Sequence, residues 1–430
     1  MPEQKKAVVP RLRFPEFRDA GPWEVKRVGY FLTESRIDGS TGDIAKKLTV
    51  KLWGGGVVSK NEYLPGSPNT KYYRRKAGQF IYSKLDFLNG AFGIIPYELD
   101  GYESTLDLPA FDFTKAIVPR FFLEYVRRPQ FYKKHGEQAD GSRKAKRIQV
   151  DYFLDLYVAV PCLAEQQKIA DCLSSLDEVI ELQAKQLEAL KAHKKGLMQQ
   201  LFPREGETTP RLRFPEFRDA GPWEVKRLGD VYQFIPTNSF SREQLTYESG
   251  TIKNIHYGDI HTKYRALFDV EREHVPFLIG NGVTEDFDDE RFCVPGDVIL
   301  ADASEDLDDI GKAIEIVNIG SHKVVAGLHT LHARQLAEDL VIGFGGCLFQ
   351  GNAIREQIRK QAQGAKVLGI SATRLKSIKL AAPRKPEQQK IADCLSSLDE
   401  LIELQAKQLE ALQTHKKGLM QQLFPQEIDL

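Results

Sequence analysis

The stretch "EQQKIADCLSSLDEVIELQAKQLEALKAHKKGLMQQLFP", residues 165–203, recurs at residues 387–425 with three changes. Steps of alternately four and three residues from Ile169 or Ile391 land on an aliphatic residue at eight of ten positions in each copy. This 3.5-residue period, which ends at Pro203 and Pro425, predicts a long coiled-coil helix in each copy. The positions expected to pair the helices are Ile169, Leu173, Leu176, Ile180, Leu187, Leu190, Ile391, Leu395, Leu398, Ile402, Leu409 and Leu412.

Each helix needs a partner for its apolar stripe, and the nearest one is the other copy. A helix of about 37 residues is roughly 55 Å long, and an antiparallel pair would place a twofold axis near the middle. Gln183 and Gln405 interrupt the stripe near its centre. They could form a buried polar pair that fixes the register, or each could reach water; the sequence favours neither reading.

A shorter stretch, "PRLRFPEFRDAGPWEVKR", is also repeated without change, at residues 10–27 and 210–227. The chain therefore reads as short repeat, unique segment and long repeat, twice over, with unique segments at about 28–160 and 228–383. Both unique segments mix strand-like and helix-like stretches, and Gly78 and Gly93 are spaced like Gly296 and Gly311. We expect an α+β fold with pseudo-twofold symmetry, in which two similar mixed α/β domains are separated by two long antiparallel coiled-coil helices. The predicted boundaries are 1–160 and 210–383 for the domains, 161–203 and 384–430 for the helices, and 204–209 for a linker.

Composition limits the class of protein. Sixty basic and sixty acidic residues give a formal net charge of zero, which argues against a simple basic nucleic-acid coat protein. Five cysteines without a C-x-x-C pair argue against a disulfide framework or a zinc ribbon. No run has the length of a signal peptide or a bilayer span, so we expect a cytoplasmic protein without a membrane partner.

The sequence lacks the motifs of the enzymes that act on DNA. It has no [N/D]-P-P-[Y/F] motif for methylation of a base amino group and no P-loop, so we expect neither methyl transfer nor ATP hydrolysis here. No Cys/His ligand set surrounds His256 and His261, and we expect no metal site. "HTLH", residues 329–332, is interpreted as strand.

The arrangement resembles a specificity subunit of a Type I restriction-modification system. The resemblance rests on "PRLRFPEF…WEVKRLGDV" before a recognition segment, "EQQKIADCLSSLDE" after a proline, "KKGLMQQLF" at the end of each helix, and "IHYGDIHTKY" at residues 255–264. It covers essentially the whole chain, and the repeated helices are its strongest part.

The resemblance implies a non-catalytic, DNA-binding subunit that serves DNA methylation and phage defence. Each half would hold one target-recognition domain that reads one half of a split target in double-stranded DNA. The paired helices would set the gap and dock two methyltransferase (modification) subunits, and restriction (translocase) subunits would join the full complex. This subunit would bind no cofactor, because S-adenosylmethionine, and ATP with Mg for restriction, would belong to the partner subunits.

Cations beside aromatic residues suggest where DNA contacts lie. In the first segment the candidates are Lys51, Trp53, Lys71, Arg74 and Arg75, with the basic turn Arg143, Lys144, Lys146 and Arg147. In the second segment they are His256, Tyr257, Asp259, His261, Lys263, Tyr264 and Arg265, with Lys366 in the place of the basic turn. An ordinary solvated loop or a packed strand edge remains the alternative for any single one of them.

One acidic stretch argues against DNA binding. Residues 285–309 carry eleven acidic residues and one basic residue, which should repel DNA, and we interpret the stretch as a solvated face. The alternative to a DNA-binding subunit is a non-enzymatic coiled-coil scaffold with two protein-binding heads, since the duplicated helices alone fit both functions.

Overall fold

The computed structural model describes residues 8–60, 66–137, 147–280 and 287–425. The chain forms two compact units, one from Met1–Ala184 with Gln408–Leu430 and the other from Lys185–Lys407. Each unit contains a globular α/β part and one segment of each long helix. Within the described residues, no helix is both long and apolar enough to cross a membrane.

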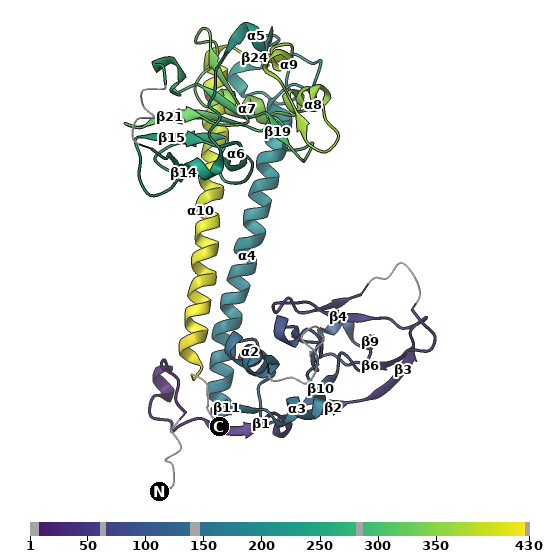
Figure 1. Cartoon of the computed structure of the whole chain (residues 1–430). Helices are drawn as coiled ribbons and strands as arrows, with labels where there is room; N and C mark the ends of the chain where they lie inside the picture. The colour runs from purple at the N-terminus through teal and green to yellow at the C-terminus, as the bar shows by residue number, and fades with distance from the viewer. Residues whose placement is uncertain (1–7, 61–65, 138–146, 281–286, 426–430) are drawn as a thin grey trace. The chain divides into compact units, whose positions relative to one another are not determined.

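The first unit contains several small antiparallel sheets (Figure 1), and its core is rich in aromatic residues. Its largest sheet has the strand order β2-β10-β7-β8, beside the sheets β3-β6-β9, β4-β5 and β1-β11. The strands are β1 (Glu24–Arg27), β2 (Leu32–Ser35), β3 (Ile37–Thr41), β4 (Leu48–Val50), β5 (Val57–Ser59), β6 (Lys71–Arg74), β7 (Phe80–Tyr82), β8 (Phe92–Ile94), β9 (Glu103–Ser104), β10 (Ala110–Phe113) and β11 (Tyr157–Val160). The helices before the long repeat are α1 (Pro119–Val126), α2 (Pro129–Glu137) and α3 (Val150–Asp155).

The second unit is built around a mixed five-stranded sheet with the order β13-β22-β18-β20-β16. A second sheet, β14-β17-β15-β21, and the pairs β12-β24 and β19-β23 complete it. The strands are β12 (Glu224–Arg227), β13 (Tyr232–Ile235), β14 (Leu245–Thr246), β15 (Ile252–Ile255), β16 (Leu267–Asp269), β17 (Phe277–Leu278), β18 (Val298–Ala301), β19 (Ala303–Ser304), β20 (Ala313–Asn318), β21 (Lys323–Ala326), β22 (Thr330–Gln335), β23 (Leu368–Gly369) and β24 (Lys379–Ala382). The short helices are α5 (Leu228–Val231), α6 (Tyr257–Thr262), α7 (Phe344–Gln350), α8 (Asn352–Gln361) and α9 (Ala372–Lys376).

The long repeats form α4 (Leu163–Leu201) and α10 (Lys385–Leu423), each of 39 residues. In the first unit the beginning of α4 packs with the end of α10, and in the second unit the end of α4 packs with the beginning of α10 (Figure 1). The two helices therefore run antiparallel, which confirms the predicted pairing. Lys416 lies 2.7 Å from Asp177 in the first unit, and Lys194 lies 2.5 Å from Asp399 in the second. The two ion pairs join the same two positions of the repeat, with the two copies exchanged.

The apolar stripe predicted from the sequence faces inward. Ile169, Leu173 and Leu187 of α4, and Ile391 and Leu395 of α10, are buried. The other predicted pairing positions, Leu176, Ile180, Leu190, Leu398, Ile402, Leu409 and Leu412, are half-buried. The Oε1 atoms of Gln183 and Gln405 are also buried, and neither has a hydrogen-bond partner among the described residues. The reading in which both glutamines reach water is therefore wrong for these oxygens.

The short repeat joins the ends of both long helices. Arg13 donates two hydrogen bonds, of 2.7 and 2.6 Å, to the Glu165 carboxylate at the beginning of α4, while the Trp23 ring packs 6.2 Å from Phe424 after the end of α10. The second unit repeats this arrangement with Arg213 and Glu387, and with Trp223 and Phe202. The name "helix clamp" is used below for each set of four residues. Burial of each tryptophan contributes about 2–3 kcal/mol, and the clamp explains why the short repeat is preserved in both halves.

The units also share strand positions within otherwise different sheets. β1 pairs antiparallel with β11, and β12 pairs antiparallel with β24 in the same register, so each short repeat closes onto the strand that leads into a long helix. Gly78 and Gly296 adopt φ values of 82° and 93° directly before β7 and β18. Glycine takes up this left-handed conformation without the Cβ clash of other residues, so Gly78 and Gly296 mark equivalent turns. The second glycines are not equivalent, because Gly93 lies inside β8 and Gly311 lies in a turn with a φ of 64°.

Candidate nucleic-acid interface

The turn between β4 and β5 carries the first predicted contact residues. Lys51 is exposed, and Trp53 is 68% exposed with a left-handed φ of 55°. The backbone around Trp53 is fixed by hydrogen bonds from the Trp53 amide to Asn89 and from the Gly54 amide to Gly90, of 2.7 and 3.0 Å. The turn therefore holds a large aromatic surface outward on a well-anchored backbone.

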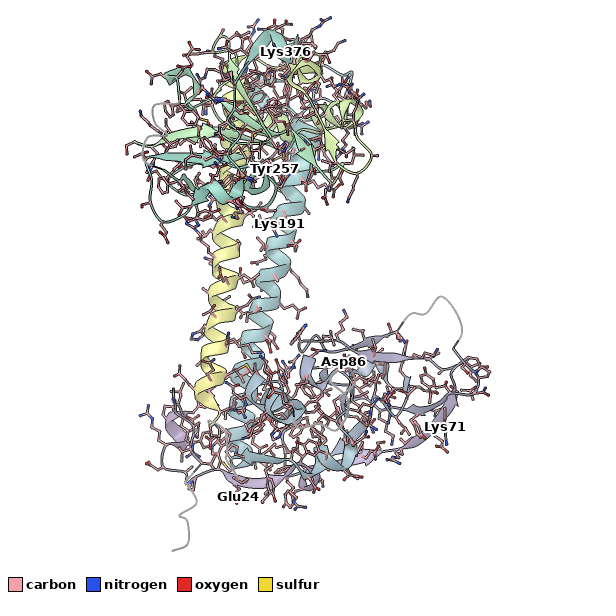
Figure 2. All side chains as sticks on the ribbon, viewed as in Figure 1. Glu24, Lys71, Asp86, Lys191, Tyr257 and Lys376 are labelled. Atoms are coloured by element: carbon pink, nitrogen blue, oxygen red, sulfur yellow. The ribbon has the colours of Figure 1, made fainter. Side chains whose placement is uncertain are left out.

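The candidates on β6 separate into exposed and buried residues. Lys71 lies at the outer end of the β3-β6 ribbon of this unit, where its ammonium is 2.9 Å from Asp38 (Figure 2). Arg74 is exposed. Arg75 is a correction to the predicted set, because its side chain is 1% exposed and donates hydrogen bonds to Ser104 and to the Ser35 carbonyl. Burial lowers the pKa of Arg75 to about 10, which fits a structural role inside the domain.

The basic turn is described only at its last residue. Arg147 is exposed and lies 3.7 Å from Asp107. Arg143, Lys144 and Lys146 lie outside the described residues.

In the second unit, α6 brings several predicted residues together. His256 caps the helix, since its Nδ1 accepts a hydrogen bond of 3.1 Å from the Gly258 amide, and burial lowers the pKa of His256. Tyr257 is labelled in Figure 2, and its ring lies 6.1 Å from His261 and 5.3 Å from His329. The sequence signalled the first three residues of this aromatic cluster but not His329, which joins from the turn before β22.

Asp259 is buried on the inner side of α6 and is a second correction. Its carboxylate contacts Arg242 at 2.5 Å and Lys263 at 2.8 Å. Burial opposes its ionisation, but these two cations lower the pKa of Asp259 below its ordinary value. Asp259 therefore positions Lys263 and Arg242, and no sequence pattern singled out Arg242. Tyr264 is a third correction, because it is 7% exposed and belongs to the core of the unit.

The last two candidates differ in their surroundings. Arg265 donates hydrogen bonds of 2.6 and 3.2 Å to Glu403 of α10, beside a cavity of about 560 Å³. It therefore ties the segment after α6 to the long helix. Lys366 is exposed between α8 and β23. The exposed candidates of both units stay predictions, since no contact with DNA is measured.

The acidic stretch is partly used inside the protein, although its first two residues lie outside the described chain. Asp308 pairs with Arg359 at 2.8 Å, and Asp302 lies 3.2 Å from His329. Glu305 and Asp306 are exposed. The solvated-face interpretation is therefore wrong for Asp297, which is 1% exposed.

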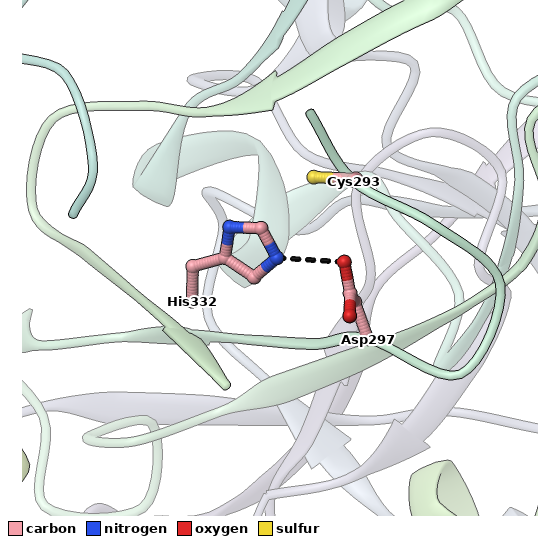
Figure 3. Close-up of side chains that lie close together, drawn as sticks. All are labelled: Cys293, Asp297 and His332. Atoms are coloured by element: carbon pink, nitrogen blue, oxygen red, sulfur yellow. Dashed lines mark hydrogen bonds and ion pairs between the residues drawn. The ribbon is translucent and has the colours of Figure 1, made fainter. Parts of the chain in front are cut away.

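Asp297 is part of a buried group with Cys293 and His332, whose candidate ligand atoms lie within 4.8 Å of one another (Figure 3). The Asp297 carboxylate already accepts hydrogen bonds from His332, from two nitrogens of Arg334 and from the Val294 amide. Burial raises the pKa of the Cys293 thiol, which opposes the thiolate that a metal would need. The donor set therefore fits a buried hydrogen-bond network around Asp297 better than a metal centre, with His332 Nδ1 left unpartnered among the described residues.

Comparisons with known proteins match this architecture. The profile of the family described as Type I restriction modification DNA specificity domain matches residues 221–414. Two relatives from Methanocaldococcus jannaschii are the type I restriction enzyme specificity subunits named MjaX and MjaVIII, at 25% and 27% identity. The matched regions cover 72% and 64% of this chain, and 67% and 63% of those relatives.

Solved structures show the same fold over nearly the whole chain. The Type I restriction-modification S subunit from M. genitalium aligns with a TM-score of 0.56 at 13% identity, over 98% of this chain and all of that one. A chain from a structural study of type I R-M assembly and conformational transition aligns with a TM-score of 0.55 at 15% identity, over 94% of this chain and 97% of that one.

The chain shares with these solved structures a fold of mixed α/β parts and two long paired helices. Residues 221–414 thus match the Type I restriction modification DNA specificity domain, and the chain is similar to type I restriction enzyme specificity subunits over 72% and 64% of its length.

Proposed function

We propose that each unit of this chain reads one half of a split DNA target, with the gap set by α4 and α10. One observation carries the proposal: the two copies of the long repeat make the same contacts in both units, whereas the globular parts of the units differ. Lys194–Asp399 and Lys416–Asp177 are the same ion pair made twice, while the globular parts differ in sheet topology. A constant helix pair with two different domains suits a target with two unrelated halves at a fixed spacing.

The same proposal assigns one methyltransferase subunit to each copy of the long repeat. Leu182 in α4 and Leu404 in α10 occupy the same position of the repeat and are 56% and 53% exposed. Val179 and Leu401, which also correspond, are 43% and 40% exposed. Exposed apolar side chains at matching positions are typical of a protein interface, and two equal interfaces call for two equal partners. Restriction subunits would join the assembled complex and would carry the ATP-dependent chemistry.

The net charge of zero fits a subunit that depends on its partners for phosphate contacts. We therefore expect the isolated chain to bind duplex DNA weakly and the complex with methyltransferase to bind it tightly. Similar affinities with and without methyltransferase would contradict this expectation.

Methylome sequencing of a host that expresses this chain with and without its methyltransferase tests the proposal. A new split motif that is methylated only when both proteins are present is the expected result. Absence of new methylation, with both proteins expressed and S-adenosylmethionine present, would instead favour the scaffold with two protein-binding heads. The motif also supplies the two half-sites and the gap for the experiments below.

A further inference from the structure

The chain has three tryptophans, and they occupy two kinds of environment. Trp23 and Trp223 are each 3% exposed in the helix clamps, whereas Trp53 is 68% exposed. The neighbouring Leu52 is 42% exposed. Two large exposed apolar side chains at successive positions of one turn indicate a surface that is covered in the working complex.

The backbone at Trp53 is held in a conformation that its side chain disfavours. Its φ of 55° is in the left-handed region, where bulky residues other than glycine are rare and cost about 1–2 kcal/mol. Such outliers persist where the surrounding contacts fix them, and they concentrate at functional sites. Here the fixing contacts are the bonds to Asn89 and Gly90 and a hydrogen bond from the Arg127 guanidinium to the Gly54 carbonyl.

A chain of polar contacts connects this turn to the long helices of the same unit. Arg127 lies 3.4 Å from Glu124, and Glu124 lies 3.5 Å from Lys416 of α10. Lys416 in turn pairs with Asp177 of α4. Glu124 is 1% exposed, so the connection passes through the interior of the unit. The direction of the Trp53 side chain is thereby tied to the helix pair that sets the spacing.

From these observations we propose that Trp53 contacts bases of the half-site read by the first unit. Its indole packs against the bases as an apolar wedge, and the exposed Lys51 lies beside it for the phosphate backbone. Every base offers a π-face to an indole, and apolar side chains that enter a base step partly unstack it. The cation next to the aromatic surface favours DNA over a second apolar protein surface. This inference rests on the proposed function, since it needs a duplex bound to the first unit.

The first measurement follows Trp53 in the assembled complex. This chain is labelled with 5-fluorotryptophan and combined with unlabelled methyltransferase, so that only three fluorine signals arise. The Trp53→Phe variant identifies the Trp53 signal by its loss. We expect that signal to shift when duplex with the split motif is added and to stay in place when methyltransferase alone is added.

The second measurement compares affinities of complexes for the motif. Trp53→Ala should weaken binding about 5- to 150-fold, the range for loss of one base–aromatic stacking contact, and Trp53→Phe should restore most of it. Scrambling the half-site of the first unit should abolish the difference between wild type and Trp53→Ala. Tyr97→Ala, at an exposed aromatic residue of the same unit (84%), is the control and should change affinity less than twofold.

The outcomes separate the two proposals. If the wild-type complex neither binds nor methylates a split motif, the proposed function fails. If it does both, but Trp53→Ala changes binding less than twofold or the fluorine signal ignores DNA, the inference about Trp53 is wrong. A Trp53 signal that shifts on adding methyltransferase alone, together with loss of assembly in Trp53→Ala on size-exclusion chromatography, would assign the residue to the protein interface and overturn the inference.

Discussion

Two residues other than glycine adopt a left-handed backbone among the described residues, Trp53 in the first unit and His329 in the second. Each lies in a turn beside candidate DNA contacts, and each has a largely exposed side chain. At both positions the backbone is locally strained, and the same backbone conformation fixes the direction of the side chain.

The strain at Trp53 predicts a separation of stability from binding. Trp53→Gly should raise the free energy of unfolding by roughly 1 kcal/mol relative to Trp53→Ala, because glycine alone relieves the left-handed clash. Urea unfolding of the two variants measures the difference. Both variants should bind the split motif equally poorly, and equal stabilities would show that the turn relaxes without cost.

Glu315 should make the free energy of unfolding depend on pH. Burial raises its pKa to about 7, while the Gly346 amide donates to one carboxylate oxygen and the other has no partner among the described residues. A carboxyl with a raised pKa in the folded state stabilises the protein below its unfolded pKa and loses that contribution as pH rises towards 7. The free energy of unfolding should therefore fall by about 2 kcal/mol between pH 5.5 and 7.5 relative to Glu315→Gln. Parallel urea titrations of both proteins test this, and identical pH profiles would contradict it.

Single residues were the hardest features to predict from the sequence. Arg74 and Arg75 are adjacent in "KYYRRK", yet one is exposed and the other is buried. The partners that decide this, Ser35 and Ser104, are 40 and 29 residues away in the chain, and no local pattern reports contacts at such separations. Arg242, and the anchoring of the Trp53 turn by Arg127, could not be predicted for the same reason: their contacts join residues that are distant in the sequence.

At the scale of secondary-structure elements, the helix clamps are the main contacts between the short repeats and the long helices. Each joins a short repeat to the beginning of one long helix and the end of the other. Within each clamp the arginine–glutamate pair is almost fully buried, with side-chain exposures of 9% and 1% for Arg13 and Glu165 and 7% and 3% for Arg213 and Glu387. A buried arginine left without its carboxylate is strongly unfavourable.

Glu165→Gln and Glu387→Gln should therefore each destabilise the protein by about 3 kcal/mol. Hydrogen exchange should show the loss of protection in β1 and β11 for the first variant, and in β12 and β24 for the second. Glu16→Gln is the matched control, since its carboxylate is 45% exposed and pairs with Lys168 at the surface; it should change stability by less than about 0.5 kcal/mol. Unequal effects of the two clamp variants would argue against equivalent clamps.

The exposed leucines of the long helices predict the partner stoichiometry. A charge at Leu182 or at Leu404 should remove one methyltransferase binding surface and leave the other, so Leu182→Glu and Leu404→Glu should each assemble with one methyltransferase and the double variant with none. Native mass spectrometry reads the stoichiometry directly. Lys191→Gln, which copies the residue at the equivalent position 413, should still bind two. Two bound subunits in either leucine variant would place the interface elsewhere.

The long helices were predictable because a 3.5-residue apolar period is a local signal that needs no tertiary information. Their antiparallel pairing was predictable because the only similar apolar stripe in the chain is the second copy. The sheets were not, since the unique segments have short strands whose pairing depends on distant partners. In the second unit β15 pairs with β21 and β16 pairs with β20, both in parallel across long insertions.

At the scale of the whole molecule, the proposed function assigns recognition to the unique segments and spacing to the long repeats. A chain that carries residues 228–383 in both recognition positions should methylate a motif with two identical, inverted half-sites and an unchanged gap. Methylome sequencing of a host with this chimera and the methyltransferase provides the test. A changed gap would show that the recognition segments, and not only α4 and α10, set the spacing.

The helix clamps have a topological consequence. The Leu212 amide donates to the Gln200 carbonyl where the linker 204–209 joins the halves, and the Leu12 amide donates to the Gln422 carbonyl in the same way at the two ends of the chain. The contact between Leu12 and Gln422 in the first unit thus repeats the contact between Leu212 and Gln200 in the second, without a covalent connection beside it. A circular permutant that begins at residue 210 and joins residue 425 to residue 10 through a copy of "REGETT" would move the chain ends next to Leu212 and Gln200 and preserve every clamp contact. We expect this permutant to fold with the same stability in urea as the parent chain, and a large loss of stability would show that the order of the two halves matters.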